Sequence, residues 1–388
     1  MKRGWCPSLY EPMPTGDGLL VRVKPPGARL ASDAARSLAQ AAARFGNGTV
    51  ELTSRGNLQI RGLTADSVPH FAAAMVAAGL ASVDPAVERR RNVMSAPLAG
   101  DDPAAAGDAV SLSAAIEAML AAEPALAALP AKFGFAVDGG GVLGLAEPAD
   151  IVVRTDGVRH WIVLGDMQAP CPSRTTVGIV RDLALATGSR RMKDWECNAV
   201  VGSLGLAQAA APVRVTPARP VGFLPYPGTE RGAFAIGLPF GQADATSIDF
   251  LASLADRFSD GTLRTSPWRA VLLGSVRVGD VASLRDAADA AGLIADPADR
   301  RLQMAACIGS AGCASGTVRT RDAALALATA GWTEFLHVSG CAKGCAHPGA
   351  AAHTLVGDAG SYNLVRDGCA HDPPFATGLT LSQAAAQL

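Results

Sequence analysis

The chain has 388 residues, which at roughly 150 residues per domain predicts two or three domains with several buried cores. Hydrophobic residues make up 49% of the sequence and charged residues 18%, a balance that excludes wholesale disorder. The 34 Lys and Arg residues are matched by 35 Asp and Glu residues, which excludes nucleic-acid binding by bulk positive charge.

The sequence gives no sign of membrane attachment or export. Prolines at positions 7, 12 and 14 follow the basic N-terminal residues and leave no apolar stretch of signal-peptide length. No later segment has about 18 consecutive apolar residues. The eight cysteines are too sparse for a disulfide framework, and five of them follow residue 300. We therefore expect a cytoplasmic protein with a metal site in its C-terminal part.

An internal repeat organises the predicted elements. In the first copy the pattern predicts a strand, a turn, an Ala-rich helix and a second strand, at 19–23, 25–27, 32–45 and 49–60. Residues 232–274 repeat this order, with a strand at 233–238 and a helix at 246–258. The pattern Arg-Phe-x-Asn/Asp-Gly-Thr-aliphatic begins at Arg44 in the first copy and at Arg257 in the second.

Longer α/β segments follow each copy. The first predicts a helical stretch, three short strands and a helix ended by a glycine, at 101–131, 132–137, 151–154, 160–164 and 173–187. A proline-rich linker at 210–231 leads to the second copy. After that copy come two helices and a buried strand, at 281–291, 320–330 and 335–338. We expect an α+β fold divided at 1–88, 89–215, 216–275 and 276–388.

A glycine motif at 139–144 has the spacing of a dinucleotide-binding loop. Pro148 and a further predicted strand follow it, where such a site needs the N-terminus of a helix. The motif is therefore interpreted as a glycine hairpin turn.

Four cysteines form two pairs near the C-terminus. Five residues separate Cys307 from Cys313, and three separate Cys341 from Cys345. Structural zinc prefers about two to four intervening residues, whereas a 4Fe-4S cluster accepts varied loops because each thiolate binds a different iron. The spacing favours an iron–sulfur cluster, with zinc and unligated core thiols as alternatives. The remaining cysteines are isolated and are interpreted as structural: Cys6, Cys171, Cys197 and Cys369.

Together with these cysteines, three motifs resemble the sirohaem nitrite/sulfite reductase superfamily. They are Leu52-Thr53-Ser54-Arg55-Gly56-Asn57-Leu58-Gln59, Arg91-Asn92-Val93 and Leu129-Pro130-Ala131-Lys132-Phe133. Within the superfamily, Trp5-Cys6-Pro7 and residues 14–20 are most similar to the precorrin-3B synthases of aerobic cobalamin synthesis. The resemblance implies ferredoxin-like half-domains at 1–88 and 216–275, and α/β units at 89–215 and 276–388, the second carrying the cluster.

The resemblance implies a monooxygenase that hydroxylates precorrin-3A with O2 and closes a γ-lactone, giving precorrin-3B. It also implies a 4Fe-4S cluster and NADH as the ultimate reductant. No segment predicts a nicotinamide or flavin fold, so we expect electrons to arrive from a separate reductase or ferredoxin. The alternatives are a sirohaem-dependent nitrite or sulfite reductase and a non-catalytic tetrapyrrole-binding protein. We expect no sirohaem, because it would occupy the cleft that a precorrin must enter.

Arginines suit a precorrin, because each planar guanidinium can pair with one of its carboxylates. In the resemblance, Arg55 and Gln59 match macrocycle-facing positions, and Arg91 and Lys132 match anion-pocket positions. A strand period of two adds Asn57 and Arg61 to the same face. The predicted substrate-binding set is therefore Arg55, Asn57, Gln59, Arg61, Arg91 and Lys132, with a solvated strand face as the alternative.

Three further predictions concern single positions. Gly134 stands where the reductases usually carry a second lysine, so the anion pocket is expected to be rebuilt for another reactant. Arg191 is interpreted as a solvated charge. A mononuclear non-haem iron is implied by the resemblance, and His347, two residues after Cys345, is its candidate ligand. The alternative for His347 is an ordinary packed or surface histidine.

Overall fold

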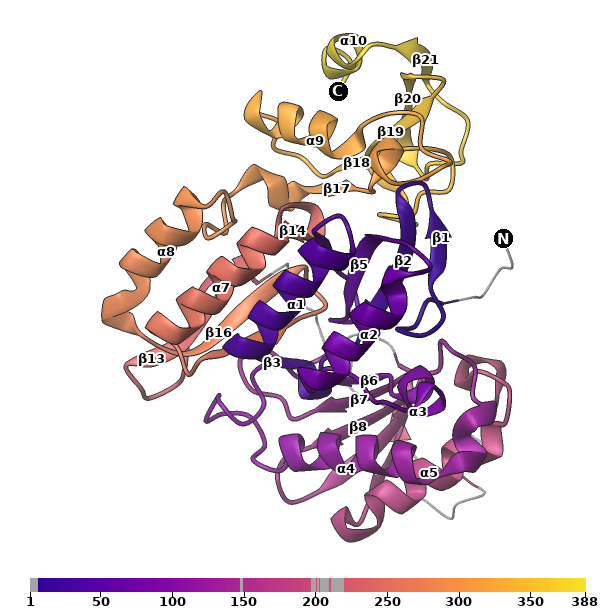
Figure 1. The fold of residues 1–388 in the computed structure, drawn as a ribbon, viewed down its shortest axis with the longest axis vertical. Helices are drawn as coiled ribbons and strands as arrows, with labels where there is room; N and C mark the ends of the chain where they lie inside the picture. Colours follow the sequence, from indigo (N-terminus) through magenta and orange to yellow (C-terminus); the bar gives the residue numbers. More distant parts are fainter. Residues whose placement is uncertain (1–5, 147–148, 197–199, 201, 203–208, 211–219) are drawn as a thin grey trace.

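The strands of the described part of the chain form four sheets. The computed structural model describes residues 6–146, 149–196, 200, 202, 209–210 and 220–388. Cys197 and part of the proline-rich linker lie outside these residues. The two repeats lie in the middle of Figure 1, with the first α/β unit below them and the second, which ends at the C-terminus, above them.

The first repeat forms an antiparallel sheet with the order β1-β2-β5-β4-β14. Its strands are β1 (Met13–Thr15), β2 (Gly18–Val23), β5 (Leu58–Leu63), β4 (Thr49–Leu52) and β14 (Gln242–Asp244). Its helices are α1 (Ser32–Phe45), α2 (Ser67–Ala77) and α3 (Pro85–Arg90). Every second residue of β4 is buried, the period expected of a strand that packs one face on a core.

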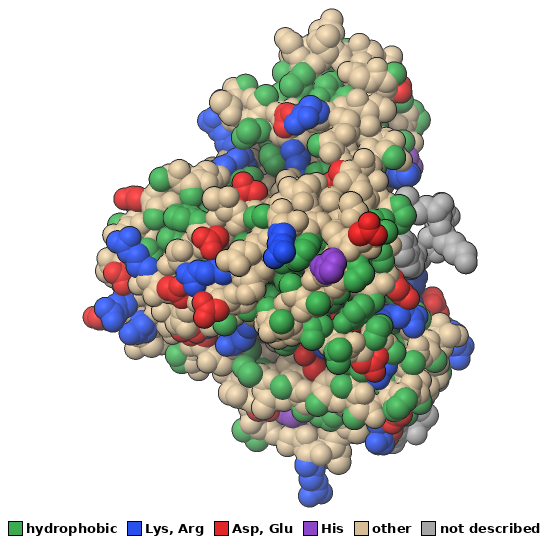
Figure 2. Space-filling view, in the orientation of Figure 1, with side chains coloured by type: hydrophobic (Ala, Val, Ile, Leu, Met, Phe, Trp, Pro, Cys, Tyr) green, Lys and Arg blue, Asp and Glu red, His purple; other side chains and the backbone are tan. Residues whose placement is uncertain are grey.

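The second repeat forms an equivalent sheet with the order β12-β13-β16-β15-β3. Its strands are β12 (Gly222–Pro225), β13 (Arg231–Gly237), β16 (Ala270–Arg277), β15 (Thr262–Thr265) and β3 (Arg29–Ala31). Its helices are α7 (Ala245–Phe258) and α8 (Val281–Ala290). On the face shown in Figure 2, positive and negative side chains are interspersed over α7 and α8.

The two repeats exchange their edge strands. Strand β3 belongs to the first repeat but pairs with β15 of the second, and β14 belongs to the second but pairs with β4 of the first. The exchange is reciprocal down to single bonds: the N–H of Ser32 donates to the carbonyl of Gly261, and the N–H of Ala245 donates to that of Gly48. Because α1 and α7 also pack against each other, the two repeats share one hydrophobic core.

The helices predicted in the two repeats are confirmed, whereas one predicted strand is wrong. Helix α1 covers 32–45 as expected, because its alanines and Leu38 give it one apolar face against the core. The strand predicted at 49–60 is two strands, β4 and β5, joined by a turn at 53–57. Gly56 has a φ of 69° in that turn, a conformation that glycine adopts without strain.

The first α/β unit has a six-stranded sheet with the order β11-β10-β9-β8-β7-β6. Its strands are β6 (Val93–Ser95), β7 (Phe135–Asp138), β8 (Ile151–Thr155), β9 (His160–Leu164), β10 (Met167–Cys171) and β11 (Ala209–Ala210), with helices α4 (Ala109–Ala122) and α5 (Thr176–Thr187). Strands β7 and β8 are parallel, so the hairpin predicted at 139–144 is wrong. The glycines there begin a crossover, because parallel neighbours cannot be joined by a tight turn.

The second α/β unit has a five-stranded sheet with the order β17-β18-β19-β20-β21. Its strands are β17 (Met304–Ala306), β18 (Leu336–Ser339), β19 (Ala351–Asp358), β20 (Ser361–Gly368) and β21 (Ala376–Leu379), with helices α9 (Thr320–Thr329) and α10 (Leu381–Ala385). The first three strands are parallel. No helix in the described part of the chain is both long and apolar enough to cross a membrane.

Candidate active site

The parallel pairing of β17 and β18 brings the two cysteine loops, with four cysteines, to one edge of a sheet. Cys307 and Cys313 follow the C-terminal end of β17, and Cys341 and Cys345 follow that of β18. Burial raises the pKa of the Cys345 thiol, and the other three sulfurs raise it further. The four cysteines therefore face a common region, and none of them is in a disulfide.

The two cysteine loops touch through glycine. The N–H of Gly340 donates to the sulfur of Cys307, 3.2 Å away. A Cβ atom at Gly340 would lie 3.0 Å from the Cα of Gly309, in the other loop. Only glycine allows this approach, which supplies an N–H donor to a cysteine sulfur.

The chemistry of this donor set fits a cluster better than a single ion. Among the described residues, no three His, Cys, Asp or Glu side chains are grouped so as to hold one metal ion. A 4Fe-4S cluster needs no such close group, because each thiolate binds its own iron at a corner of the cube. Four free thiols around one region, with an N–H directed at one sulfur, meet that requirement.

A second group of side chains, here called the basic group, consists of Arg22, Arg55 and Arg191. Arg55 lies in the turn between β4 and β5 and donates to the carbonyl of Lys132 over 3.2 Å. Burial lowers the pKa of Arg55, and the positive charges of Arg191 and Arg22 lower it further. Asp150 and Cys6 oppose this effect only in part. Arg191 and Arg22 therefore each repel Arg55, and a bound anion would relieve this repulsion.

The basic group extends beyond the predicted set. Arg22 on β2 donates to the side-chain oxygen of Gln59 over 3.4 Å, while Arg191 pairs with the buried Asp150 over 2.7 Å. Arg191 is thus not the solvated charge that the sequence suggested, because Asp150 directs it toward Arg55. Neither residue belongs to a motif, and the alternation of residues along β2 was the only signal for Arg22.

The predicted substrate-binding residues separate into different environments. Arg55 and Asn57 lie in the turn and Gln59 and Arg61 on β5, so the four do not share one strand face. Arg55 and Asn57 line a small cavity with Ser95 and Thr265, far too small for a macrocycle. Gln59 and the carbonyl of Lys132 contact the basic group.

Arg61 and Arg91 are turned inward. Arg61 is 4% exposed and pairs with Asp17 and Glu51, with nitrogen–oxygen distances of 2.9 and 3.3 Å. Arg91 is 8% exposed and pairs with the fully buried Glu88 over 2.9 Å. The geometry therefore favours structural roles for both arginines over direct contact with a substrate.

Gly134 has a specific steric environment. A Cβ atom at this position would lie 3.2 Å from the side-chain nitrogen of Asn92 and 3.6 Å from the guanidinium of Arg55. A lysine side chain would have to grow into this space. The guanidinium of Arg55 thus lies beside the position where the reductases usually carry a lysine.

His337 and His347 lie next to each other in the second α/β unit. His337 is fully buried with no hydrogen-bond partner on either ring nitrogen, and its ring centroid lies 5.7 Å from that of His347. Burial lowers the pKa of His337 to about 4, with contributions from His347 and Arg269. Nε2 of His347 lies 3.2 Å from the carbonyl of Ala350. No carboxylate completes a triad with them among the described residues.

Comparison with known proteins supports this reading of the fold and identifies the family. The nitrite/sulfite reductase ferredoxin-like half domain matches twice, at residues 11–78 and 227–291, which confirms the predicted duplication. A precorrin-3B synthase from Sinorhizobium sp. is 32% identical over 97% of this chain and 85% of its own length. The chain belongs to the precorrin-3B synthase family of the nitrite/sulfite reductase superfamily.

This precorrin-3B synthase family member is also similar to a reductase and to a solved structure. A ferredoxin–nitrite reductase from Synechococcus elongatus is 26% identical over 91% of the chain and 78% of its own length. The structure of the Mycobacterium tuberculosis NirA protein matches with a TM-score of 0.68 at 19% identity, covering 89% of this chain and 74% of that one. The predicted α+β fold of the nitrite/sulfite reductase type is therefore confirmed.

Proposed function

We propose that the protein converts precorrin-3A to precorrin-3B by oxygen-dependent hydroxylation and γ-lactone formation. The observation that carries the proposal is the 32% identity to a precorrin-3B synthase over 97% of the chain. The position of Gly134 beside Arg55 agrees with it, because a residue without a side chain stands where a lysine suited to a small inorganic anion is usual. In such a monooxygenation one oxygen atom enters the product, and two electrons and two protons convert the other to water.

In this proposal the basic group binds the macrocycle through its carboxylates. Each arginine offers a planar fork of N–H donors, and charge-assisted pairs of this kind are about twice as strong as neutral hydrogen bonds. Gln59 and Asp150 hold Arg22 and Arg191 in place. A carboxylate bound between the three guanidinium groups would also reduce their mutual repulsion.

The C-terminal loops supply the redox site in the proposal. Cys307, Cys313, Cys341 and Cys345 would hold a 4Fe-4S cluster, which when bound transfers electrons one at a time. His347 stays the candidate ligand of a mononuclear iron, and the neighbouring ring of His337 is a second nitrogen donor in the same place. Electrons from NADH would reach the cluster through a separate reductase or ferredoxin.

A sirohaem-dependent nitrite reductase is the second candidate, favoured by the 26% identity to the Synechococcus elongatus enzyme. The two functions differ in what the purified protein contains. Metal and sulfide analysis with an absorption spectrum of anaerobically purified protein distinguishes them. We expect four irons per cluster, acid-labile sulfide and additional iron, without the intense Soret and red bands of sirohaem.

The reaction itself is tested with labelled oxygen. Protein supplied with reductant, precorrin-3A and ¹⁸O₂ should form a hydroxylated lactone that contains one labelled atom. Sirohaem bands in the spectrum would overturn the synthase assignment in favour of the reductase. A product without label would overturn the monooxygenase reaction even if sirohaem is absent.

A further inference from the structure

Each cysteine loop accepts a hydrogen bond from one arginine, and the two arginines come from different repeats. Arg61 is buried and Arg269 is partly buried. Arg61 on β5 of the first repeat donates to the carbonyl of Gly312, directly before Cys313, over 2.6 Å. Arg269, just before β16 of the second repeat, donates to the carbonyl of Ala346, directly after Cys345, over 3.2 Å. Each repeat therefore donates a hydrogen bond to one of the two cysteine loops of the proposed cluster site.

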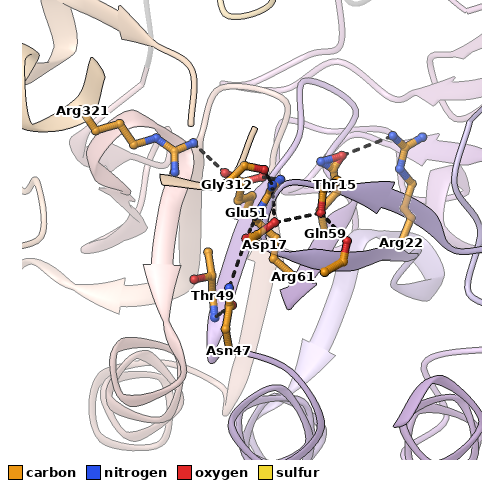
Figure 3. Close-up of polar contacts among 11 residues, drawn as sticks. Thr15, Asp17, Arg22, Asn47, Thr49, Glu51, Gln59, Arg61, Gly312 and Arg321 are labelled. Carbon is orange, nitrogen blue, oxygen red and sulfur yellow. Dashed lines mark hydrogen bonds and ion pairs between the residues drawn. The ribbon is translucent and has the colours of Figure 1, made fainter. Parts of the chain in front are cut away.

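Arg61 is fixed in this position by a network of carboxylates, drawn in Figure 3. Two of its nitrogens lie 2.9 Å from the carboxylate oxygens of Asp17, and a third lies 3.3 Å from Glu51. Glu51 in turn pairs with Arg321 of α9 over 2.6 Å. Burial opposes the ionisation of Asp17, but its hydrogen bonds with Arg61 and Thr15 outweigh burial and lower its pKa.

Backbone contacts also hold the loop that contains Cys313. The N–H of Gly16 donates to the same carbonyl of Gly312 over 3.1 Å. A Cβ atom at Gly16 would lie 2.8 Å from the backbone nitrogen of Ala314, so only glycine lets the two segments approach so closely. The carbonyl before Cys313 thus receives two hydrogen bonds, one of them from a charged donor.

Arg269 occupies an unfavourable backbone conformation to make its contact. Val50 pairs with Ile60 in the first repeat and Leu263 pairs with Leu273 in the second, so Gly56 and Arg269 hold equivalent places. Both have positive φ, 69° for the glycine and 60° for Arg269. A residue with a side chain disfavours this left-handed region, and such strain persists where the surrounding structure enforces it.

The side chain of Arg269 also carries uncompensated charge. One terminal nitrogen is buried and has no hydrogen-bond partner among the residues that the structure describes. Burial lowers the pKa of Arg269, and the neighbouring Arg321 lowers it further against the opposing effect of Glu51. Within this group three guanidinium groups, of Arg61, Arg269 and Arg321, face the carboxylates of Asp17 and Glu51, so one positive charge remains.

We infer that Arg61 and Arg269 are positioning residues for the cluster, which fix the two cysteine loops and place positive charge beside them to favour the reduced cluster. This inference rests on the proposed function, which supplies the cluster. Reduction adds negative charge, and a nearby buried cation stabilises the reduced form, because interactions in a poorly solvated interior are weakly screened. Arg61 is thereby assigned to the redox site and not to the substrate.

The test is the midpoint potential of the cluster in Arg269→Gly, measured by a redox titration followed by electron paramagnetic resonance, without substrate. Glycine suits the positive φ of this position, so the variant is expected to fold. We expect reduction to become at least tenfold less favourable, which for a one-electron couple is a shift of about 59 mV to more negative potential. Arg269→Lys keeps the positive charge and should recover part of the shift.

Arg231→Gln is the matched control. Arg231 lies on β13 of the same repeat and also donates to a backbone carbonyl, that of Ser275, but it contacts neither cysteine loop. Its substitution should leave the potential unchanged. A cluster with the same potential in Arg269→Gly and in the control would overturn the inference alone. Wild-type protein without iron and sulfide would instead overturn the cluster of the proposed function, and the inference with it.

Discussion

Sequence motifs place both Arg55 and Arg91 in the predicted substrate-binding set, yet the two arginines have different surroundings. The side chain of Arg55 donates to one backbone carbonyl and faces other cations, and among the described residues no carboxylate forms an ion pair with it, although Asp150 acts on it from a distance. Arg91 bonds to Glu88 through two nitrogens and to the carbonyl of Leu80. A sequence motif shows that an arginine is present, but the carboxylate that neutralises its charge is determined by the fold.

Arg55→Ala should weaken binding of the tetrapyrrole. A charge-assisted hydrogen bond in a partly desolvated site contributes about 1.5–3 kcal/mol, which is roughly a tenfold to hundredfold change in affinity. Titration of the protein with a precorrin, or with a stable tetracarboxylate analogue, measures the change. Arg181→Ala, on the exposed side of α5, is the control and should bind normally. Equal affinity in both variants would show that Arg55 does not contact the substrate.

Arg91→Ala should lower stability. Removal of the guanidinium leaves the carboxylate of Glu88, which is fully buried, without its ion partner, and breaking such a pair costs about 3–5 kcal/mol. Chemical denaturation measures the free energy of unfolding. If Arg91→Ala unfolds like the wild type but loses affinity for the tetrapyrrole, the assignment from the motif is right and the structural role is wrong.

Lys24 makes stability depend on pH. Its ammonium group donates to the carbonyls of Glu88 and Arg89, and burial lowers its pKa to about 8, although Glu88 opposes the shift. Between pH 8 and about 10.5 the unfolded chain keeps a proton on Lys24 that the folded protein has released, so stability rises with pH in this window. The contribution is lost as the pH falls through 8.

The pH effect is isolated by comparison with Lys24→Met. The wild type should gain up to about 3 kcal/mol over the variant between pH 8 and 10.5, measured by urea denaturation at each pH. Other titrating groups are common to both proteins and cancel in the difference. A difference that stays constant across the window would show that Lys24 has an ordinary pKa in the folded protein.

At the scale of elements, the sequence predicts the two long helices of the repeats well and turns poorly, whereas the helical stretch predicted at 101–131 is an α-helix only over 109–122. The hydrophobic period and the residue composition place α1 and α7 within one residue of their observed bounds. Both signals depend only on residues that are neighbours along the same helix. The strand predicted at 49–60 fails, because the turn at Gly56 interrupts a run whose residue types all suit a strand. Likewise, nothing local shows that β7 and β8 are parallel, since direction is set by the path of the chain between them.

The site shows the same limit. Spacing along the chain indicates the cysteine pairs, because each pair lies in one loop. The basic group could not be predicted in full, because Arg22, Arg55 and Arg191 come from three separate segments of the chain. The inward orientation of Arg61 depends on Asp17 and Gly312, which lie 44 and 251 residues away.

The exchange of edge strands can be tested at one hydrogen bond. Ala245 is the first residue of α7, a position where proline is well tolerated, and Asp244 before it has extended φ and ψ angles of −97° and 172°. Ala245→Pro therefore removes only the N–H that donates to Gly48. We expect a loss of about 0.5–1.5 kcal/mol in thermal or chemical unfolding.

Ala245→Ser is the control for that substitution, because serine keeps the N–H and is compatible with the start of a helix. It should unfold close to the wild type. If the proline variant is equally stable, the bond between the repeats contributes nothing to the fold.

At the scale of the whole molecule, the proposed supply of electrons from outside predicts slow turnover with NADH alone. Addition of a ferredoxin or reductase fraction should speed cluster reduction, followed as bleaching of the visible absorbance under anaerobic conditions. The control is dithionite, which reduces an accessible cluster without a protein donor. Rapid stoichiometric reduction by NADH with no added protein would contradict this prediction and require a nicotinamide site on this chain.

The exchange of β3 and β14 has a consequence for how the chain is made. During synthesis from the N-terminus, the first repeat emerges complete in sequence but with the edge of β4 unpaired, because its partner β14 follows almost two hundred residues later. Strand β3 likewise waits for β15, which is complete only once Thr265 has been synthesised. The intervening α/β unit has its own core and can fold in the meantime. A pause or a truncation inside that unit would therefore leave two strands with unpaired edges that can associate with other chains. Nascent chains of that length should be the most dependent on chaperones.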